Sequence, residues 1–296
     1  MFLRLLATGC VLVVMVGVPT RASATLTFNL NFTDNALAAF DASEQALFQQ
    51  GLDFWDGIID GHQDGVSRTW TIEVDAFDEA PVNGAVRLGF AGPRELFFSN
   101  QIAGAPLSNE RYILPGAGIA VFNVNPAVNL RLDTIKHEFA HGLGVGTLWE
   151  DNEVYNDGIA GNSNRTLPGG IPGQYVGANA LATFQQEFVG QSSATFIPVE
   201  LAGGAGTAHG HWDEADNLGV SPTGIVDFDG NDLRSELMTG FLADGPIFLA
   251  DFTVQSLVDL GYTLEATAIP EPSSVLACVL ATIWLAGRRR SPTILR

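Results

Sequence analysis

Hydrophobic and polar residues alternate in several short segments of the chain, and this period of two is typical of β-strands with one buried face. The clearest example is Trp-Thr-Ile-Glu-Val-Asp-Ala-Phe at residues 70–77, where every second side chain is apolar. The same alternation covers residues 25–32, 86–90 and 118–124. We therefore expect a sheet in the first half of the chain.

Longer segments carry apolar residues at helical spacing. Residues 36–59 contain Ala, Phe, Leu and Trp at this spacing, and Asn35 or Asp34 is placed to cap the segment. Two further helices are predicted at residues 130–142 and 178–188. Together these elements predict an α+β fold of about 245 residues, enough for one large domain or two closely packed lobes.

The first 24 residues have the pattern of an export signal. Arg4 supplies a positive charge, residues 5–18 form an apolar segment, and Ala-Ser-Ala at 22–24 is a typical cleavage site. The mature chain is then expected to begin at Thr25. We predict an exported protein.

The last 28 residues, 269–296, also resemble an address signal. Ile-Pro-Glu-Pro-Ser-Ser at 269–274 precedes an apolar segment at 275–286 and three arginines at 288–290. This order resembles the PEP-CTERM signal of Gram-negative bacteria, which implies a transient tether and a sorting and processing machinery at the inner membrane. An ordinary C-terminal membrane anchor is the alternative, although the apolar segment is shorter than the roughly 20 residues of a spanning helix. Both interpretations place the body of the protein outside the cytoplasm, at the cell surface or in the extracellular space.

The body between these signals is strongly acidic. It holds eight basic and 32 acidic residues, a formal charge of about −24. Nucleic acid and anionic membranes are poor partners for such a surface. The two cysteines, Cys10 and Cys278, both lie in the terminal segments, so the body contains no disulfide.

The candidate chemistry lies in the segment His-Glu-Phe-Ala-His at residues 137–141. Histidines four positions apart lie on the same face of a helix, so His137 and His141 can both bind one metal ion. Zinc is the metal that this pattern favours, and it lowers the pKa of a bound water towards neutrality. Glu138 is then available as a general base for that water.

A two-histidine site needs a third protein ligand, and its source is open. Gly144 is placed to end the helix with a left-handed turn, but Thr147 occupies the position where the elongated HExxHxxGxxH pattern has its third histidine. The other histidines of the chain are His62, His209 and His211, of which His62 is most simply a surface turn residue. A carboxylate is the alternative ligand, from Glu150, Asp151 or Glu153.

These residues resemble the leishmanolysin-like metzincin peptidases. The match runs in order from His137 to Tyr262, through His-Glu-Phe-Ala-His-Gly-Leu-Gly, His-Trp at 211–212, Glu-Leu-Met-Thr-Gly at 236–240 and Ser-Leu-Val-Asp-Leu-Gly-Tyr at 256–262. The stretch between His211 and Met238 is longer than the family usually has, and the disulfides of its eukaryotic members are absent.

The resemblance implies a zincin fold and a site. Residues 25–146 would form an N-terminal lobe with a twisted mixed sheet, a backing helix and the active-site helix, and residues 147–268 a C-terminal lobe across a cleft. The implied zinc ligands are His137, His141 and His211, with Glu138 as the base and Met238 in a Met-turn. His211 is preferred to His209 because Trp212 follows it.

The implied activity is that of a secreted zinc endopeptidase acting on protein or peptide substrates. A substrate of such an enzyme binds as an extended strand along a sheet edge, for which residues 118–123 are the candidate. A catalytically inactive zinc protein of the cell surface or matrix is the alternative. The intact Glu138 argues against it, because a purely structural site needs no base.

An acidic turn follows the third histidine. Asp227, Asp229 and Asp232 have the early spacing of a calcium loop, but Met238 stands where an EF-hand needs a bidentate glutamate. A simpler calcium-binding turn and a plain acidic turn both fit the pattern. Glu236 is a candidate for orienting a ligand histidine.

Overall fold

The computed structural model describes residues 25–82, 85–159, 167–204, 206–214, 221–242 and 245–266. The predicted export signal at 1–24 and the sorting signal at 269–296 lie outside the described residues. In the described part of the chain, no helix is both long and apolar enough to cross a bilayer.

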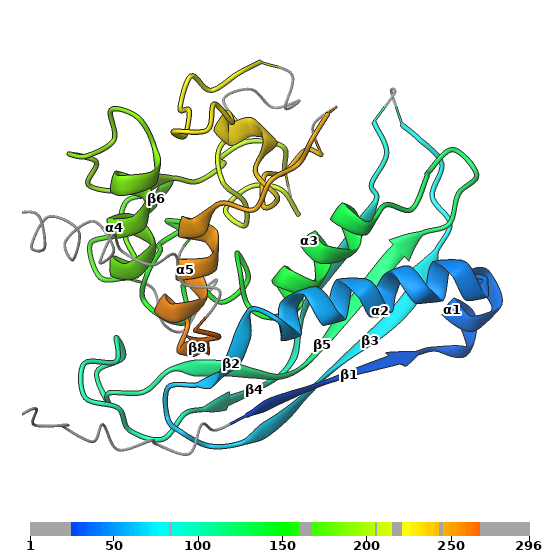
Figure 1. Ribbon diagram of the computed structural model, residues 1–296, viewed down its shortest axis with the longest axis horizontal. Helices are drawn as coiled ribbons and strands as arrows, with labels where there is room; N and C mark the ends of the chain where they lie inside the picture. Colours follow the sequence, from blue (N-terminus) through cyan, green and yellow to red (C-terminus); the bar gives the residue numbers. More distant parts are fainter. Residues whose placement is uncertain are drawn as a thin grey trace, which may run out of the picture.

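A mixed sheet of four strands underlies the first half of the chain (Figure 1). The strands are β1 (Leu26–Phe32), β3 (Arg68–Phe77), β4 (Gly89–Phe98) and β5 (Ile113–Asn123). Their order is β1-β3-β5-β4, with β3 parallel to both of its neighbours and β4 antiparallel to β5. The predicted α+β class with a mixed sheet is confirmed.

Side-chain alternation explains how the sheet faces the core. In β3 the side chains of Trp70, Ile72, Val74 and Ala76 are buried, and the residues between them are more exposed. One face of the sheet is therefore apolar and covered by helices, as the period of two predicts.

The edge strand β4 differs most from its prediction. The segment expected at 86–90 begins at Gly89 and continues to Phe98, through a bulge near Pro93 and Glu95. Polar residues and proline are tolerated there because one side of an edge strand has no partner strand. The hydrophobic pattern therefore predicted a strand that is too short and begins too early.

Among the described residues of this half there are three helices, and α2 and α3 lie over one face of the sheet (Figure 1). They are α1 (Asp34–Ala39), α2 (Ala42–Asp56) and α3 (Leu132–Gly142). The single helix predicted at 36–59 is wrong, because Asp41 interrupts it. The Asp41 side chain accepts the Glu44 amide while the Glu44 side chain accepts the Asp41 amide, a capping box that starts a new helix. Thr33, rather than Asn35 or Asp34, caps α1.

Close packing fixes the position of α3. A Cβ atom on Gly51 of α2 would lie 2.5 Å from Cγ2 of Ile135, and one on Gly142 would lie 3.0 Å from Cδ1 of Ile72. Gly51 therefore lets α3 approach α2 more closely than a Cβ atom would permit, and Gly142 allows a tight contact with the sheet. The helix is held against α2 on one side and against the sheet on the other.

The second half of the chain contains fewer regular elements. They are β6 (Gln174–Tyr175), α4 (Ala178–Glu187), β7 (Ile197–Pro198), the 3-10 helix η1 (Leu233–Ser235), α5 (Asp251–Asp259) and β8 (Tyr262–Leu264). The buried carboxylate of Asp259 accepts the backbone amides of Asn179 and Ala180, so the end of α5 caps the start of α4. The helix predicted at 178–188 is confirmed to within one residue.

The chain's two halves are joined by an antiparallel pair of short strands, β2 (Ile59–His62) and β8. The hydroxyl of Tyr262 donates to the carbonyl oxygen of Leu143 at 2.8 Å, which ties β8 to the end of α3. His62 is stacked on Tyr262, with ring centroids 5.0 Å apart.

The expectation that His62 is a surface residue is wrong. Its side chain is 3% exposed, and neither ring nitrogen has a hydrogen-bond partner among the described residues. Burial, reinforced by the charge of Arg68 and opposed by that of Asp64, lowers the pKa of His62 to about 4. The ring is therefore neutral in the folded protein at physiological pH.

This buried histidine predicts acid sensitivity. Between about pH 6.5 and pH 4 the unfolded chain binds a proton that folded His62 does not bind, so the free energy of unfolding decreases as the pH falls. A His62→Phe variant lacks this contribution. We expect its stability relative to wild type to rise by up to about 3 kcal/mol over that range, measured by denaturant unfolding of the metal-free proteins. A difference that stayed constant with pH would contradict the prediction.

Candidate metal centre

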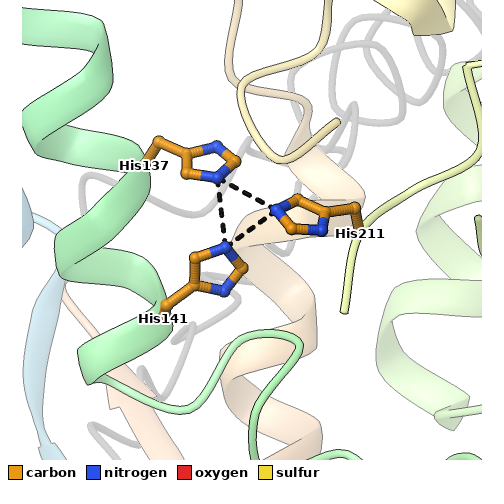
Figure 2. A group of neighbouring side chains, drawn as sticks. All are labelled: His137, His141 and His211. Atoms are coloured by element: carbon orange, nitrogen blue, oxygen red, sulfur yellow. Dashed lines mark hydrogen bonds between the residues drawn. The ribbon is translucent and has the colours of Figure 1, made fainter. Parts of the chain in front are cut away.

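The helix α3 supplies the first two side chains of the centre. His137 and His141 project from the same face, one turn apart, as Figure 2 shows. The core residues Ile135 and Phe139 are completely buried, so packing fixes the rotation of the helix about its axis. This rotation determines which way both imidazoles point.

The turn after α3 brings a distant segment to the helix. Gly144 adopts a φ of 109° and Gly146 a φ of 77°, in agreement with the predicted left-handed ending. A Cβ atom on Gly146 would lie 2.0 Å from the carbonyl oxygen of Gly210, so only glycine allows this contact. The residue before His211 therefore lies directly against the turn.

Trp212 anchors the third histidine from behind. Its ring is completely buried and stacks on Trp149 with a centroid distance of 4.5 Å, and Tyr175 and Phe252 contact it at their edges. Its indole nitrogen donates to Oγ1 of Thr253 at 2.8 Å.

The side chains of His137, His141 and His211 meet at one point (Figure 2). The Nε2 atoms of His137 and His141 are 3.1 Å apart, and Nε2 of His211 lies 3.1 Å from the first and 3.0 Å from the second. Tetrahedral ligands bound at about 2.0–2.1 Å are separated by roughly 3.4 Å. The triangle is therefore only slightly smaller than a bound ion requires.

Hydrogen bonds on the opposite side of each ring define its protonation. Each Nδ1 lies at 2.7–2.8 Å from a backbone carbonyl oxygen, and such an oxygen only accepts. The acceptors of His137, His141 and His211 are Leu237, Val145 and Thr207, in that order. The proton of each neutral ring is therefore on Nδ1, and three Nε2 lone pairs converge.

Burial keeps these rings neutral. Burial is the main cause of a lowered pKa in His137, His141 and His211. The pKa of His211 falls to about 3, and that of His141 falls well below its usual value. Neighbouring imidazoles lower the pKa of His141 and His211 further. Neutral imidazoles with converging lone pairs are suitable ligands for a metal cation.

The residues present therefore fit a metal ion. Among the described residues, the three histidines form a group whose ligand atoms lie within 4.8 Å of one another, close enough to hold a metal ion. The predicted grouping of His137, His141 and His211 is confirmed.

Glu138 lies on the same helix, between the two histidines in sequence. It is 5% exposed and accepts no hydrogen bond from the described residues. Burial raises its pKa to about 8. With this pKa the group holds its proton at neutral pH, whereas a cation on the three histidines would favour the ionised form, which can accept a proton from a water molecule.

The segment around Met238 supports the histidines through its backbone. Leu237 accepts the bond from His137, and the carbonyl oxygen of buried Met238 accepts the amide of Trp212 at 3.0 Å. Glu236 was predicted to orient a ligand histidine, but its hydrogen bonds do not go to a histidine ring. Its carboxylate instead accepts the backbone amides of Met238 and Ala250, which fixes the turn.

The other candidate ligands lie apart from this group. His209 has its Nδ1 atom 2.8 Å from the hydroxyl of Tyr155. Among the described residues, neither His209 nor the three carboxylates considered as alternatives, Glu150, Asp151 and Glu153, join the histidine group.

The acidic turn is not assembled as a second metal site in the described part of the chain. The Asp227 carboxylate accepts the amides of Asp229 and Asn231, and the Asp232 carboxylate accepts those of Thr223 and Gly224. These hydrogen bonds stabilise turns, and calcium binding near Asp227, Asp229 and Asp232 stays a prediction.

Sequence reasoning missed the backbone carbonyls that orient the rings, because every residue carries one. Their role follows only from tertiary contacts.

No model of a known protein family matches the chain, and no curated protein matches its sequence.

Removal of His211 should abolish metal binding. A His211→Ala variant leaves two imidazoles, and we expect it to lose stoichiometric zinc in metal analysis after dialysis. His209→Ala is the matched control, because it deletes a neighbouring histidine outside the triangle and should retain one zinc per chain. Zinc retention by His211→Ala would exclude the three-histidine site.

Proposed function

We propose that the protein is an exported zinc-dependent endopeptidase of the leishmanolysin-like metzincin type. The observation that carries the proposal is the convergence of three unprotonated Nε2 atoms, two of them on the same helix as the buried Glu138. Three histidine ligands leave a position open for water, whereas structural zinc sites are usually closed by four protein ligands.

The fold is compatible with this proposal. A mixed sheet with an antiparallel edge strand, a backing helix and the histidine-bearing helix occupies the first half of the chain, and the Met238 turn lies against the first ligand through Leu237. The order of these parts along the sequence agrees with the resemblance described above.

Glu138 has the central role in the proposed reaction. A bound zinc ion would supply Lewis acidity and a lowered pKa for the attacking water. Glu138 accepts the proton of that water and then delivers it to the amine nitrogen of the cleaved peptide bond. The neutral imidazoles keep their Nδ1 protons on Leu237, Val145 and Thr207 throughout.

The substrate strand is assigned to β4 instead of the segment at 118–123. That segment belongs to β5, which lies between β3 and β4, so its backbone groups are already paired. In the order of the sheet β4 comes last: one side of β4 pairs with β5, and the other side is an edge of the sheet. An extended peptide adding to β4 would gain backbone hydrogen bonds next to the histidine helix.

The cellular setting follows from the terminal segments. An export signal, a PEP-CTERM-like signal and a body without cysteine favour the cell surface or exterior of a Gram-negative bacterium. Protein or peptide substrates and an inner-membrane sorting machinery are the proposed partners.

Replacement of Glu138 separates binding from catalysis. We expect Glu138→Gln to retain one zinc per chain and to lose activity on a denatured protein substrate by about 10²- to 10⁴-fold, because the amide cannot accept the proton. Glu150→Gln is the control and should remain active. Wild-type activity should disappear with a chelator and return with zinc. Undiminished cleavage by Glu138→Gln would contradict the mechanism, and an inactive zinc-loaded wild type would favour the surface-protein alternative.

A further inference from the structure

Gly89, the first residue of β4, lies against the side chain of Glu138. A Cβ atom on Gly89 would stand 2.9 Å from Oε1 of Glu138 and 3.1 Å from its Cδ and Cγ atoms. Real Cβ atoms are essentially never this close to a neighbouring heavy atom. Any side chain at this position would therefore displace the carboxylate.

Backbone conformation does not explain this glycine. Gly89 is absent from the residues with positive φ, and it pairs with Phe122 of β5 as an ordinary strand residue. Glycine in a strand weakens it, because it has more conformational freedom to lose on folding and no side chain to pack. The three heavy atoms nearest to the position of a Cβ atom on Gly89 all belong to the Glu138 side chain.

The contact with Gly89 is the main one that positions the Glu138 carboxylate. Burial is the cause that shifts its pKa and no described residue donates a hydrogen bond to it, so packing determines where its oxygens lie. The neighbouring wall on the β4 side is the backbone of Gly89. The same strand is the edge that we assign to the substrate.

We propose that Gly89 is the positioning residue for Glu138: its missing side chain admits the carboxylate between α3 and the substrate-binding edge, in the place where it meets the attacking water. This inference rests on the proposed function. It also makes the base and the substrate edge a single unit, since Glu138 touches the strand along which the peptide lies.

The chain offers a matched control. Gly116 is also a strand glycine without a positive φ, and a Cβ atom there would make ordinary contacts of 3.5 Å with Glu95 and Phe97. Alanine should therefore be accommodated at position 116 without displacing a catalytic group. At position 89 the obstructing atoms belong to the mobile end of Glu138, so the fold should adjust by rotation of that side chain.

The experiment compares Gly89→Ala with Gly116→Ala. We expect both variants to fold and to bind one zinc per chain. Gly89→Ala should lose about 10- to 100-fold in kcat with KM within about twofold, because a displacement of about 1 Å at a reacting group has effects of this size. Crystal structures should show the Glu138 carboxylate moved in Gly89→Ala and unmoved in Gly116→Ala.

Steric coupling supplies a second readout. Glu138→Asp shortens the side chain by one methylene group, so its cost in kcat should be smaller when it is combined with Gly89→Ala than in the wild-type background. A Gly89→Ala variant with an unmoved carboxylate, or with the kcat of Gly116→Ala, would overturn the inference. An inactive wild type would instead refute the proposed function, while the crystal structures would still test the contact.

Discussion

The folded arrangement around α3 depends on three neutral imidazoles whose unprotonated Nε2 atoms lie 3.0–3.1 Å apart. Lone pairs at this distance repel one another unless a cation lies among them. Each ring is held by a carbonyl from a different part of the chain: Val145 after the helix, Thr207 before His211, and Leu237 in the Met238 turn. Metal binding is thereby coupled to the positions of all three segments.

The helix α3 can serve this centre because its other contacts leave it no freedom. Gly51 and Gly142 permit unusually close packing against α2 and the sheet. At its end, Gly146 allows the turn to meet Gly210, which brings His211 within reach. A rigid helix therefore presents two ligands and the Glu138 carboxylate together, and one tertiary contact adds the third ligand.

In our proposal the edge strand connects this centre to a peptide substrate. In the proposed enzyme, β4 offers the edge of the four-stranded sheet and, at its first residue, a glycine against Glu138. Binding and proton transfer then share one strand. The acidic body and the predicted terminal signals are consistent with the proposed location outside the cell, because a high net charge favours solubility.

The sequence by itself predicted several of the local elements and placed His137 and His141 on one face of a helix, because strand alternation, the four-residue spacing of these histidines, and a left-handed glycine are properties of neighbouring residues. It also favoured His211 through resemblance, but the capping box at Asp41 was overlooked. Tertiary structure decided which strand is the edge, since pairing partners are not encoded in a strand's own pattern. It likewise buried His62 and oriented the rings through backbone carbonyls, because these contacts join residues that lie far apart in the chain.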